Sequence, residues 1–231
     1  MKKIVFATIM LFWLNSLTFA AAINLSSWTA SGDGTWVLSG DAASVLQTKN
    51  GEPTYFVSDT NYINTLFDGS FGVETSSDDD FIGFVFGYTG PTDYILFDWK
   101  QAAQTTSNGT AAEGFTLSQI TGSDVNLWGH AGADISVLDT LYGSDKGWAD
   151  NTVYDFTLDY STTGITIKID GGTIFDISGS FGDGKFGFYN YSQEKVRYAA
   201  FDETTTVPIP GAVWLFGSGL LGLFGLRRKK R

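Results

Sequence analysis

The sequence predicts an all-β fold in which two antiparallel sheets pack face to face as a jelly roll. Between Ile23 and Phe201, apolar residues recur at every second position, the spacing that places them on one face of a strand. Gly, Asp, Ser and Asn interrupt these runs roughly every 8–12 residues, as turns do. This span shows no convincing amphipathic helix. We therefore expect residues 23–203 to form one domain of about twelve strands.

The N-terminal residues 1–22 are expected to be a helical signal peptide rather than part of this domain. Met1-Lys2-Lys3 is basic, residues 4–14 are apolar, and Ala20-Ala21-Ala22 supplies the small residues that signal peptidase needs. The alternative is an N-terminal membrane anchor, for which the apolar run is short.

The C-terminal residues 204–231 are expected to hold a linker and a membrane-directed tail. Residues 211–226 are apolar and, as a transmembrane helix, would span about 24 Å, slightly less than a typical hydrocarbon core. Residues 227–231 are all Arg or Lys, which would hold this end on the cytoplasmic side. The alternative is a permanent tail anchor.

The charge of the domain excludes one class of partner. Of 14 Lys and Arg residues, two lie in the signal segment and five in the tail, so seven remain against 25 acidic residues, a balance of −18. Nucleic-acid binding needs a basic footprint and is not expected. The acidity suits cation binding and, equally, simple solubility. The chain has no cysteine, so disulfides do not stabilise the fold.

The central feature is a predicted hairpin over residues 78–101. In its first strand Ile82, Phe84, Phe86 and Tyr88 alternate with Phe81, Gly83, Val85 and Gly87. Glycines inside a strand favour a position where other atoms approach closely, so this strand is expected to be central and covered on both faces. Residues 89–92 form the turn. The return strand places Ile95, Phe97 and Trp99 on one face and Tyr94, Leu96 and Asp98 on the other.

The remaining strands are assigned from the same alternation and from turn residues. A tight hairpin is expected at Asp68-Gly69. Residues 102–113 read as a polar flexible loop and residues 121–149 as irregular, and the first and last strands are expected to pair. The strands are predicted at 35–39, 44–48, 54–58, 61–67, 70–75, 114–120, 153–160, 164–170, 173–177, 184–191 and 196–201.

Several blocks in residues 59–201 resemble the C-terminal domain of thrombospondins. The longest is the run DDDFIGFVFGY at residues 78–88, followed by WKQ at 99–101. Shorter blocks that match in order and spacing are FDGSF at 67–71, Leu127-Trp128 with His130, Gly147-Trp148 with Asp150 and Tyr154, GKFGF at 184–188 and Ser192-Gln193-Glu194. The resemblance implies a jelly roll related to legume lectins and concanavalin A. The family's calcium repeats and cysteines are absent, so animal receptor roles are not carried over.

The end of the chain resembles a PEP-CTERM sorting tag. The tag-like features are Val207, Pro208 and Pro210, then a Gly-rich apolar segment, then the basic run beginning with Arg227 and Arg228. This resemblance implies export in a Gram-negative bacterium, processing by an exosortase, transient anchoring in the inner membrane, and a place in the cell envelope or extracellular matrix.

The strongest candidate metal ligands are Asp78, Asp79 and Asp80. Ca²⁺ takes six to eight oxygen ligands, mostly carboxylates and carbonyls. In the resembling family this acidic block lies among the calcium sites. Strand alternation would let at most two of the three reach one ion, and Asp33, Asp41, Asp98 or Asp183 would complete the site. The alternative is a solvated acidic turn.

Trp128, His130 and Trp148 are the candidate ligand-binding residues, because aromatic faces stack on sugars. The alternative is aromatic packing beneath an irregular loop. The chain has one histidine, no G-x-S-x-G motif and no E-x-D-x-x-E carboxylate pattern, so catalysis is not expected.

These observations favour an exported, non-catalytic, calcium-binding module for adhesion or for polysaccharide or another matrix component. The alternatives are a structural matrix protein without a specific ligand and a glycoside-acting enzyme.

Overall fold

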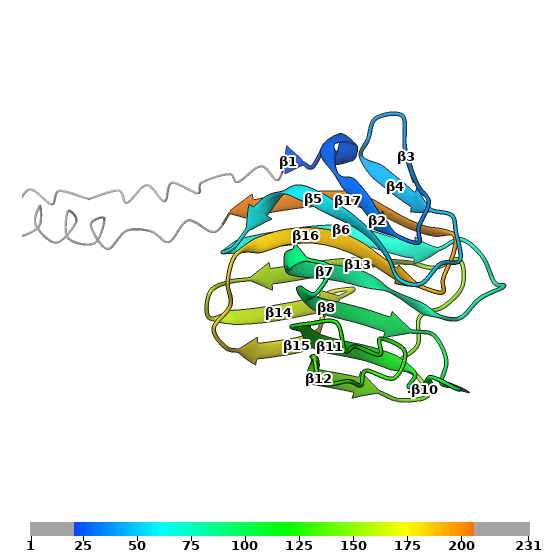
Figure 1. The fold of residues 1–231 in the computed structure, drawn as a ribbon. Coiled ribbons are helices and arrows are strands. Elements are labelled where there is room, and N and C mark those ends of the chain that lie inside the picture. Colours follow the sequence, from blue (N-terminus) through cyan, green and yellow to red (C-terminus); the bar gives the residue numbers. More distant parts are fainter. Residues whose placement is uncertain (1–20, 206–231) are drawn as a thin grey trace, which may run out of the picture.

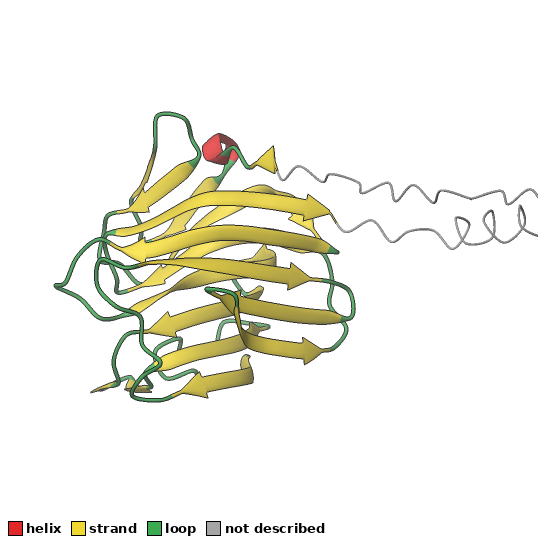
Figure 2. Cartoon of the chain, turned by 180° about the vertical axis from the view of Figure 1, so that it is seen from behind, coloured by secondary structure: helices red, strands yellow, loops and turns green. Residues whose placement is uncertain are grey.

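The computed structural model describes residues 21–205 as two large antiparallel sheets that face each other (Figure 1). This confirms the predicted all-β sandwich. The helical content of the described residues is one short 3₁₀ turn, η1 (Leu25–Ser27), seen as the red coil in Figure 2. No helix within residues 21–205 has the length and apolarity that a membrane span requires. Of the predicted signal peptide 1–22 and the predicted linker and tail 204–231, residues 1–20 and 206–231 lie outside the described residues.

One sheet has eight strands in the order β15-β14-β13-β6-β17-β4-β3, with β1 paired to β17. Its strands are β1 (Ala21–Ala22), β3 (Trp36–Leu38), β4 (Ser44–Gln47), β6 (Thr65–Val73), β13 (Val153–Tyr160), β14 (Gly164–Ile169), β15 (Gly172–Ser178) and β17 (Val196–Thr205). β17 pairs with β1, with Ala21 opposite Glu203, although residues 21–22 fall in the predicted signal peptide. The strand predicted first, at 35–39, is β3, and it pairs with β4 rather than with β17.

The other sheet has seven strands in the order β12-β11-β8-β7-β16-β5-β2. Its strands are β2 (Thr29–Gly32), β5 (Thr54–Tyr62), β7 (Phe81–Gly90), β8 (Asp93–Lys100), β11 (Gly114–Ile120), β12 (Ile135–Tyr142) and β16 (Gly184–Tyr191). A separate small hairpin joins β9 (Gln104–Thr106) to β10 (Gly109–Ala111). The predicted central hairpin is β7–β8, and β7 lies at the middle of the seven strands.

The space between the sheets is filled mainly by aromatic rings. Phe84 of β7 stacks on Phe97 of β8 with ring centroids 4.6 Å apart, and also packs on Phe156 of β13 across the sandwich at 5.1 Å. Buried aromatic groups of this size contribute the largest share of apolar burial. The face of β7 and β8 that points between the sheets is therefore one of the two faces that the two-residue alternation groups together, and it includes Phe84 and Phe97.

The opposite face of the seven-stranded sheet, which we call the outer face, is also covered. Phe81, Val85, Leu96 and Tyr189 are buried there in a second apolar cluster. Trp128, from the loop of residues 121–134, packs onto it and donates its indole N–H to the Gly109 carbonyl oxygen of β10 at 3.2 Å. The glycines of β7 lead us to expect that both faces of this strand are covered. The loop and the β9–β10 hairpin provide that cover on the outer face.

Two glycines shape β7. A Cβ at Gly83 would lie 2.0 Å from the Phe97 carbonyl oxygen of β8, so only glycine fits there. Gly87 has φ +57° at an irregularity in the β7–β8 register. Because of this irregularity, Tyr88 packs with the outer cluster rather than with Phe84 and Phe86 as the alternation predicts.

The predicted hairpin at Asp68-Gly69 is wrong. β6 runs unbroken through these residues, with Gly69 opposite Phe156 of β13 and Asp68 opposite Asp202 of β17. The chain turns instead before β6, where Asn64 has φ +55°. A strand paired on both sides, with Phe67 and Phe71 buried, outweighs the local turn propensity of Asp-Gly.

Several segments contain more structure than the sequence predicts, among them β2, which lies before the first predicted strand. The region expected to be irregular includes β12, and the loop expected to be flexible includes the β9–β10 hairpin. β12 is an edge strand of its sheet and every one of its residues is at least partly accessible to solvent, so no buried face marks it in the sequence.

Candidate functional site

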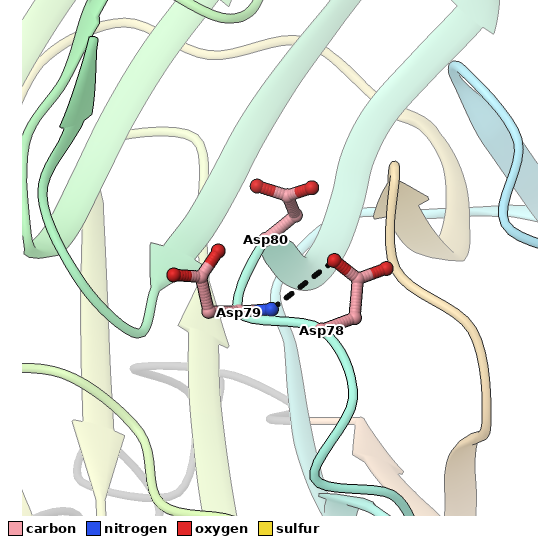
Figure 3. Close-up of side chains that lie close together, drawn as sticks. All are labelled: Asp78, Asp79 and Asp80. Carbon is pink, nitrogen blue, oxygen red and sulfur yellow. Dashed lines mark hydrogen bonds between the residues drawn. The ribbon is translucent and has the colours of Figure 1, made fainter.

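The acidic triplet Asp78, Asp79 and Asp80 lies in the segment that leads into β7. Each residue offers one carboxylate oxygen, and these oxygens lie within 4.8 Å of one another. Figure 3 shows the three carboxylates on the same side of the chain, with the Asp79 N–H donating to Asp78 Oδ1 at 3.2 Å. Strand alternation does not separate them, because β7 begins only at Phe81.

A buried lysine occupies one side of the triplet. Lys100, the last residue of β8, has a fully buried side chain whose Nζ donates to the carbonyl oxygen of Asp79 at 2.7 Å and to Asp79 Oδ1 at 2.9 Å. The Nζ also lies 3.0 Å from Asp80 Oδ1, an ion pair in which that oxygen accepts no hydrogen bond. Its charge faces the rings of Phe81 and Trp128, at 5.9 and 5.4 Å from their centroids.

Residues distant in the sequence hold the triplet backbone and side chains in place. Buried Gln193 accepts the Asp80 N–H at 2.9 Å through Oε1. Trp148 donates its indole N–H to the Asp80 carbonyl oxygen at 3.1 Å. The Asn50 side-chain amide donates to Asp78 Oδ2 at 2.5 Å. The triplet is therefore a fixed arrangement rather than a freely solvated turn.

The donor set of the triplet fits a hard divalent cation. Burial, followed by the charges of Asp80 and Asp79, raises the pKa of Asp78 to about 6. Above that pH the three carboxylates carry more negative charge than the Lys100 ammonium neutralises. An open hollow lined by Ser76, Ser77, Asp78, Asp79 and Gln101 gives access from solvent. Carboxylate oxygens of this kind are among the ligands that Ca²⁺ prefers.

None of the four aspartates offered as alternatives to complete the site joins the triplet, and each has another partner. Asp33 pairs with Lys49, and Asp41 accepts the Ser39 hydroxyl and the Ala43 N–H. Asp183 accepts the Asn61 amide, and Asp98 pairs with His130.

The three predicted ligand-binding residues have buried side chains and do not all lie together. Trp148, 2% exposed, belongs to the core between the sheets, whereas Trp128, 5% exposed, lies on the outer face. His130 contacts the same ring as Trp128, since both pack edge-on against Phe81. Their role in ligand binding stays a prediction, and their burial favours the alternative of aromatic packing beneath the loop.

His130 and Asp98 form a buried pair on the outer face. His130 Nε2 lies 2.8 Å from Asp98 Oδ2. Burial alone would lower the pKa of His130, but the Asp98 charge and hydrogen bond outweigh it and raise this pKa. Asp98 Oδ1 is buried without a hydrogen-bond partner.

Sequence reasoning missed Lys100 as the partner of the triplet. It also missed Gln193 and Asn50, which reach the triplet through the fold. A signal for Lys100 was present, because the alternation that places Leu96 and Asp98 on the outer face of β8 also places Lys100 there. The sorting residues Val207, Pro208, Pro210, Arg227 and Arg228 lie outside the described residues.

Comparison with known proteins connects this fold to one family. Residues 31–206 match the family described as "Thrombospondin C-terminal region". The chain is 31% identical over 195 residues to thrombospondin-2 of Gallus gallus and 28% identical over 191 residues to cartilage oligomeric matrix protein of Bos taurus. These alignments cover 74% and 72% of this chain but 16% and 25% of those proteins. The chain therefore spans a quarter or less of the length of these relatives.

Solved structures with a similar fold have little sequence in common with the chain. Carbohydrate-binding module CBM66 of Bacillus subtilis superposes with a TM-score of 0.57 at 11% identity, covering 78% of this chain and 96% of that module. The exoplasmic/lumenal domain of VIP36, in a Ca²⁺/Man-bound form, superposes with a TM-score of 0.55 at 12% identity, covering 79% and 84%. At these identities the likeness shows the fold.

Proposed function

The chain belongs to the thrombospondin C-terminal region family, and from this we propose that it is a non-catalytic binding module of an extracellular matrix, stabilised by calcium at its acidic triplet. The observation that carries the proposal is the convergence of the Asp78, Asp79 and Asp80 carboxylates, one oxygen of each within 4.8 Å of the others. Three carboxylates held this close repel one another more than one ammonium compensates, so a divalent cation lowers their energy.

Calcium would be held by the triplet on its solvent side. Lys100 neutralises the inner side, and the hollow beside Ser76, Ser77 and Gln101 leaves the outer side accessible. Bound calcium supplies a fixed positive charge that links the segment before β7 to its neighbours. In a chain without cysteine, this link would take the place of a covalent crosslink.

A carbohydrate of the matrix is the proposed ligand class. The fold is similar to a carbohydrate-binding module and to a domain solved with calcium and mannose, and one relative is named as a cartilage matrix protein. The burial of His130, the only histidine, supports a non-catalytic role. Export through residues 1–22 and exosortase processing at residues 204–231 belong to the same proposal and rest on the sequence resemblance.

The experiment is a pair of measurements on the purified chain at pH 7.5, where Asp78 is ionised. Calcium at millimolar concentration should raise the melting temperature by several degrees, and magnesium should raise it less because Mg²⁺ demands a stricter geometry. D78N/D79N/D80N should abolish the rise, whereas the exposed matched control Asp145→Asn should keep it. A melting temperature unchanged by calcium would remove the ion from the proposal.

The second measurement addresses the ligand. Retention of the chain on immobilised polysaccharides, compared with albumin, separates a binding module from a structural matrix protein. Retention on none of a panel of neutral and acidic polysaccharides would favour the structural alternative.

A further inference from the structure

An open groove lies on the outer side of the molecule, and its lining does not include Trp128, His130 or Trp148, the residues that the sequence predicts to bind ligand. Its volume is about 460 Å³, within the range of about 300–1,000 Å³ that is usual for small-ligand sites. Three separate segments line it: residues 52–53 before β5, the tip of the β9–β10 hairpin, and the loop of residues 121–134. Tyr191, the last residue of β16, completes the lining.

The Tyr191 ring is a rigid, half-buried platform. It packs edge-on against Phe81 with ring centroids 6.2 Å apart and at a tilt against Trp128 at 6.3 Å, and both of those rings are buried. Pro53, Val125 and Leu127 add apolar walls. A fixed aromatic surface with apolar flanks suits the C–H face of a pyranose ring.

Polar groups stand at the rim of this platform. Asn108 is exposed, and its side-chain amide forms no hydrogen bond within the described residues, so it retains two donor hydrogens and an acceptor oxygen. The hairpin tip is fixed without it, because Asn126 donates to the Asn108 carbonyl oxygen at 2.6 Å. Glu52 is also exposed and lies beside the Tyr191 hydroxyl.

The charge around the groove selects among sugars. Burial and then the Glu52 charge raise the pKa of Tyr191 to about 12, with a smaller contribution from Asp80. The Glu52 carboxylate lines the groove and is its charged group, so it repels uronic and sulfated sugars and leaves neutral hydroxyls as partners for Glu52 and Asn108.

We propose that the groove lined by Tyr191, Glu52 and Asn108 binds a neutral hexose residue of a polysaccharide. This inference deepens the proposed function by naming the site and the sugar class, and it rests on that function for the ligand being a carbohydrate. It does not require calcium. The two sites are nevertheless adjacent, because Asn50 bonds to both Asp78 and Ser192. Asn50 lies two residues before Glu52, and Ser192 directly follows Tyr191.

The test is saturation-transfer NMR on the full chain with methyl glucoside, methyl mannoside and methyl galactoside as neutral probes and glucuronic acid as the acidic probe. We expect transfer to at least one neutral probe and none to glucuronic acid. Tyr191→Ala should abolish the transfer. Asn108→Ala, at an exposed position that leaves the fold intact, should weaken binding by about threefold to tenfold, the value of one neutral hydrogen bond.

The matched control is Tyr142→Ala, which removes a part-exposed tyrosine of β12 outside the groove and should leave binding unchanged. Binding that survives both Tyr191→Ala and Asn108→Ala overturns the groove and leaves the proposed carbohydrate function standing. Absence of transfer to every neutral probe also overturns the groove, while retention on polysaccharide decides the proposed function separately. Sugar binding by a chain that does not bind calcium would overturn the proposed calcium site and support the groove.

Discussion

Lys100 is the single side chain on which the acidic triplet most depends. Its ammonium is fully buried, donates two hydrogen bonds to Asp79 and forms an ion pair with Asp80. A buried ion pair contributes little relative to an apolar pair, but removal of one partner leaves an uncompensated charge. The lysine is therefore a fixed internal cation, and a calcium ion would add to it.

Replacement of this lysine has a measurable consequence. Lys100→Met should lower the free energy of unfolding in EDTA by about 3–5 kcal/mol, because Asp80 stays buried without its counter-charge. Calcium should restore more stability to this variant than to the wild type. Urea denaturation measures both effects, with the more exposed Lys146→Met as the control. Equal stability of the Lys100 variant and the wild type in EDTA would be incompatible with this role.

The pair of His130 and Asp98 predicts a pH dependence. The pKa of His130 is raised above its ordinary 6.5 in the folded state, so the pair contributes stability that is fully present below pH 6.5. This contribution is lost as the pH rises through the folded-state pKa. Burial keeps Tyr189 and Tyr142 neutral over the same range, since it raises the pKa of both.

Asp98→Asn removes the charge that raises the pKa of His130. The wild type should therefore gain stability relative to this variant as the pH falls from 8.5 to 6, measured by urea denaturation at each pH. A stability difference that is constant over this range would show that His130 stays neutral.

At single positions, the sequence identified the triplet but not its partners. Asp78, Asp79 and Asp80 are adjacent in the chain, so their proximity needs no fold. Gln193 and Asn50 reach the triplet only because the strand order places the end of β16 beside β5 and β7. No local pattern contains that information.

Among the strands, β7 shows how a local irregularity redirects side chains. The positive φ of Gly87 shifts the register between β7 and β8, and Tyr88 moves to the outer face. This irregularity also places Gly87 under the Tyr160 hydroxyl, 2.7 Å from where a Cβ would lie.

Gly87→Ala should therefore destabilise the fold by about 1–2 kcal/mol from backbone strain, and more if Tyr160 cannot move. Gly90→Ala, at the end of the same strand, is the matched control, because a Cβ there meets nothing within 4 Å. Thermal denaturation compares the two. If the two variants have the same melting temperature, the conformation assigned to Gly87 is wrong.

Most strands with a buried face were predictable, and even the edge strands β3 and β15 fall within or close to predicted ranges, whereas the solvent-accessible edge strand β12 was missed. β7, β8, β11 and β16 follow the predicted ranges closely because their alternating residues fill two apolar clusters. β12 has no buried face to mark it. The Asp-Gly pair in β6 shows the opposite error, in which local turn propensity yields to pairing on both sides.

In the whole molecule, the seven-stranded sheet separates two kinds of packing. Its inner face packs against the other sheet. Its outer face carries the pair of His130 and Asp98 as well as the buried Trp128 ring against which Tyr191 packs. Lys100 lies on the same outer face and joins it to the acidic triplet at the strand ends. The sequence could predict the sandwich, but the cover over the outer face depends on a loop and a hairpin without apolar periodicity.

Crystals of the chain grown with about 10 mM calcium, measured at a long X-ray wavelength, test the calcium site most directly. We predict an anomalous difference peak about 2.3–2.6 Å from carboxylate oxygens of Asp78, Asp79 or Asp80, with the Lys100 ammonium still in place. A map without a peak at the triplet, or with calcium bound only elsewhere, would contradict the account.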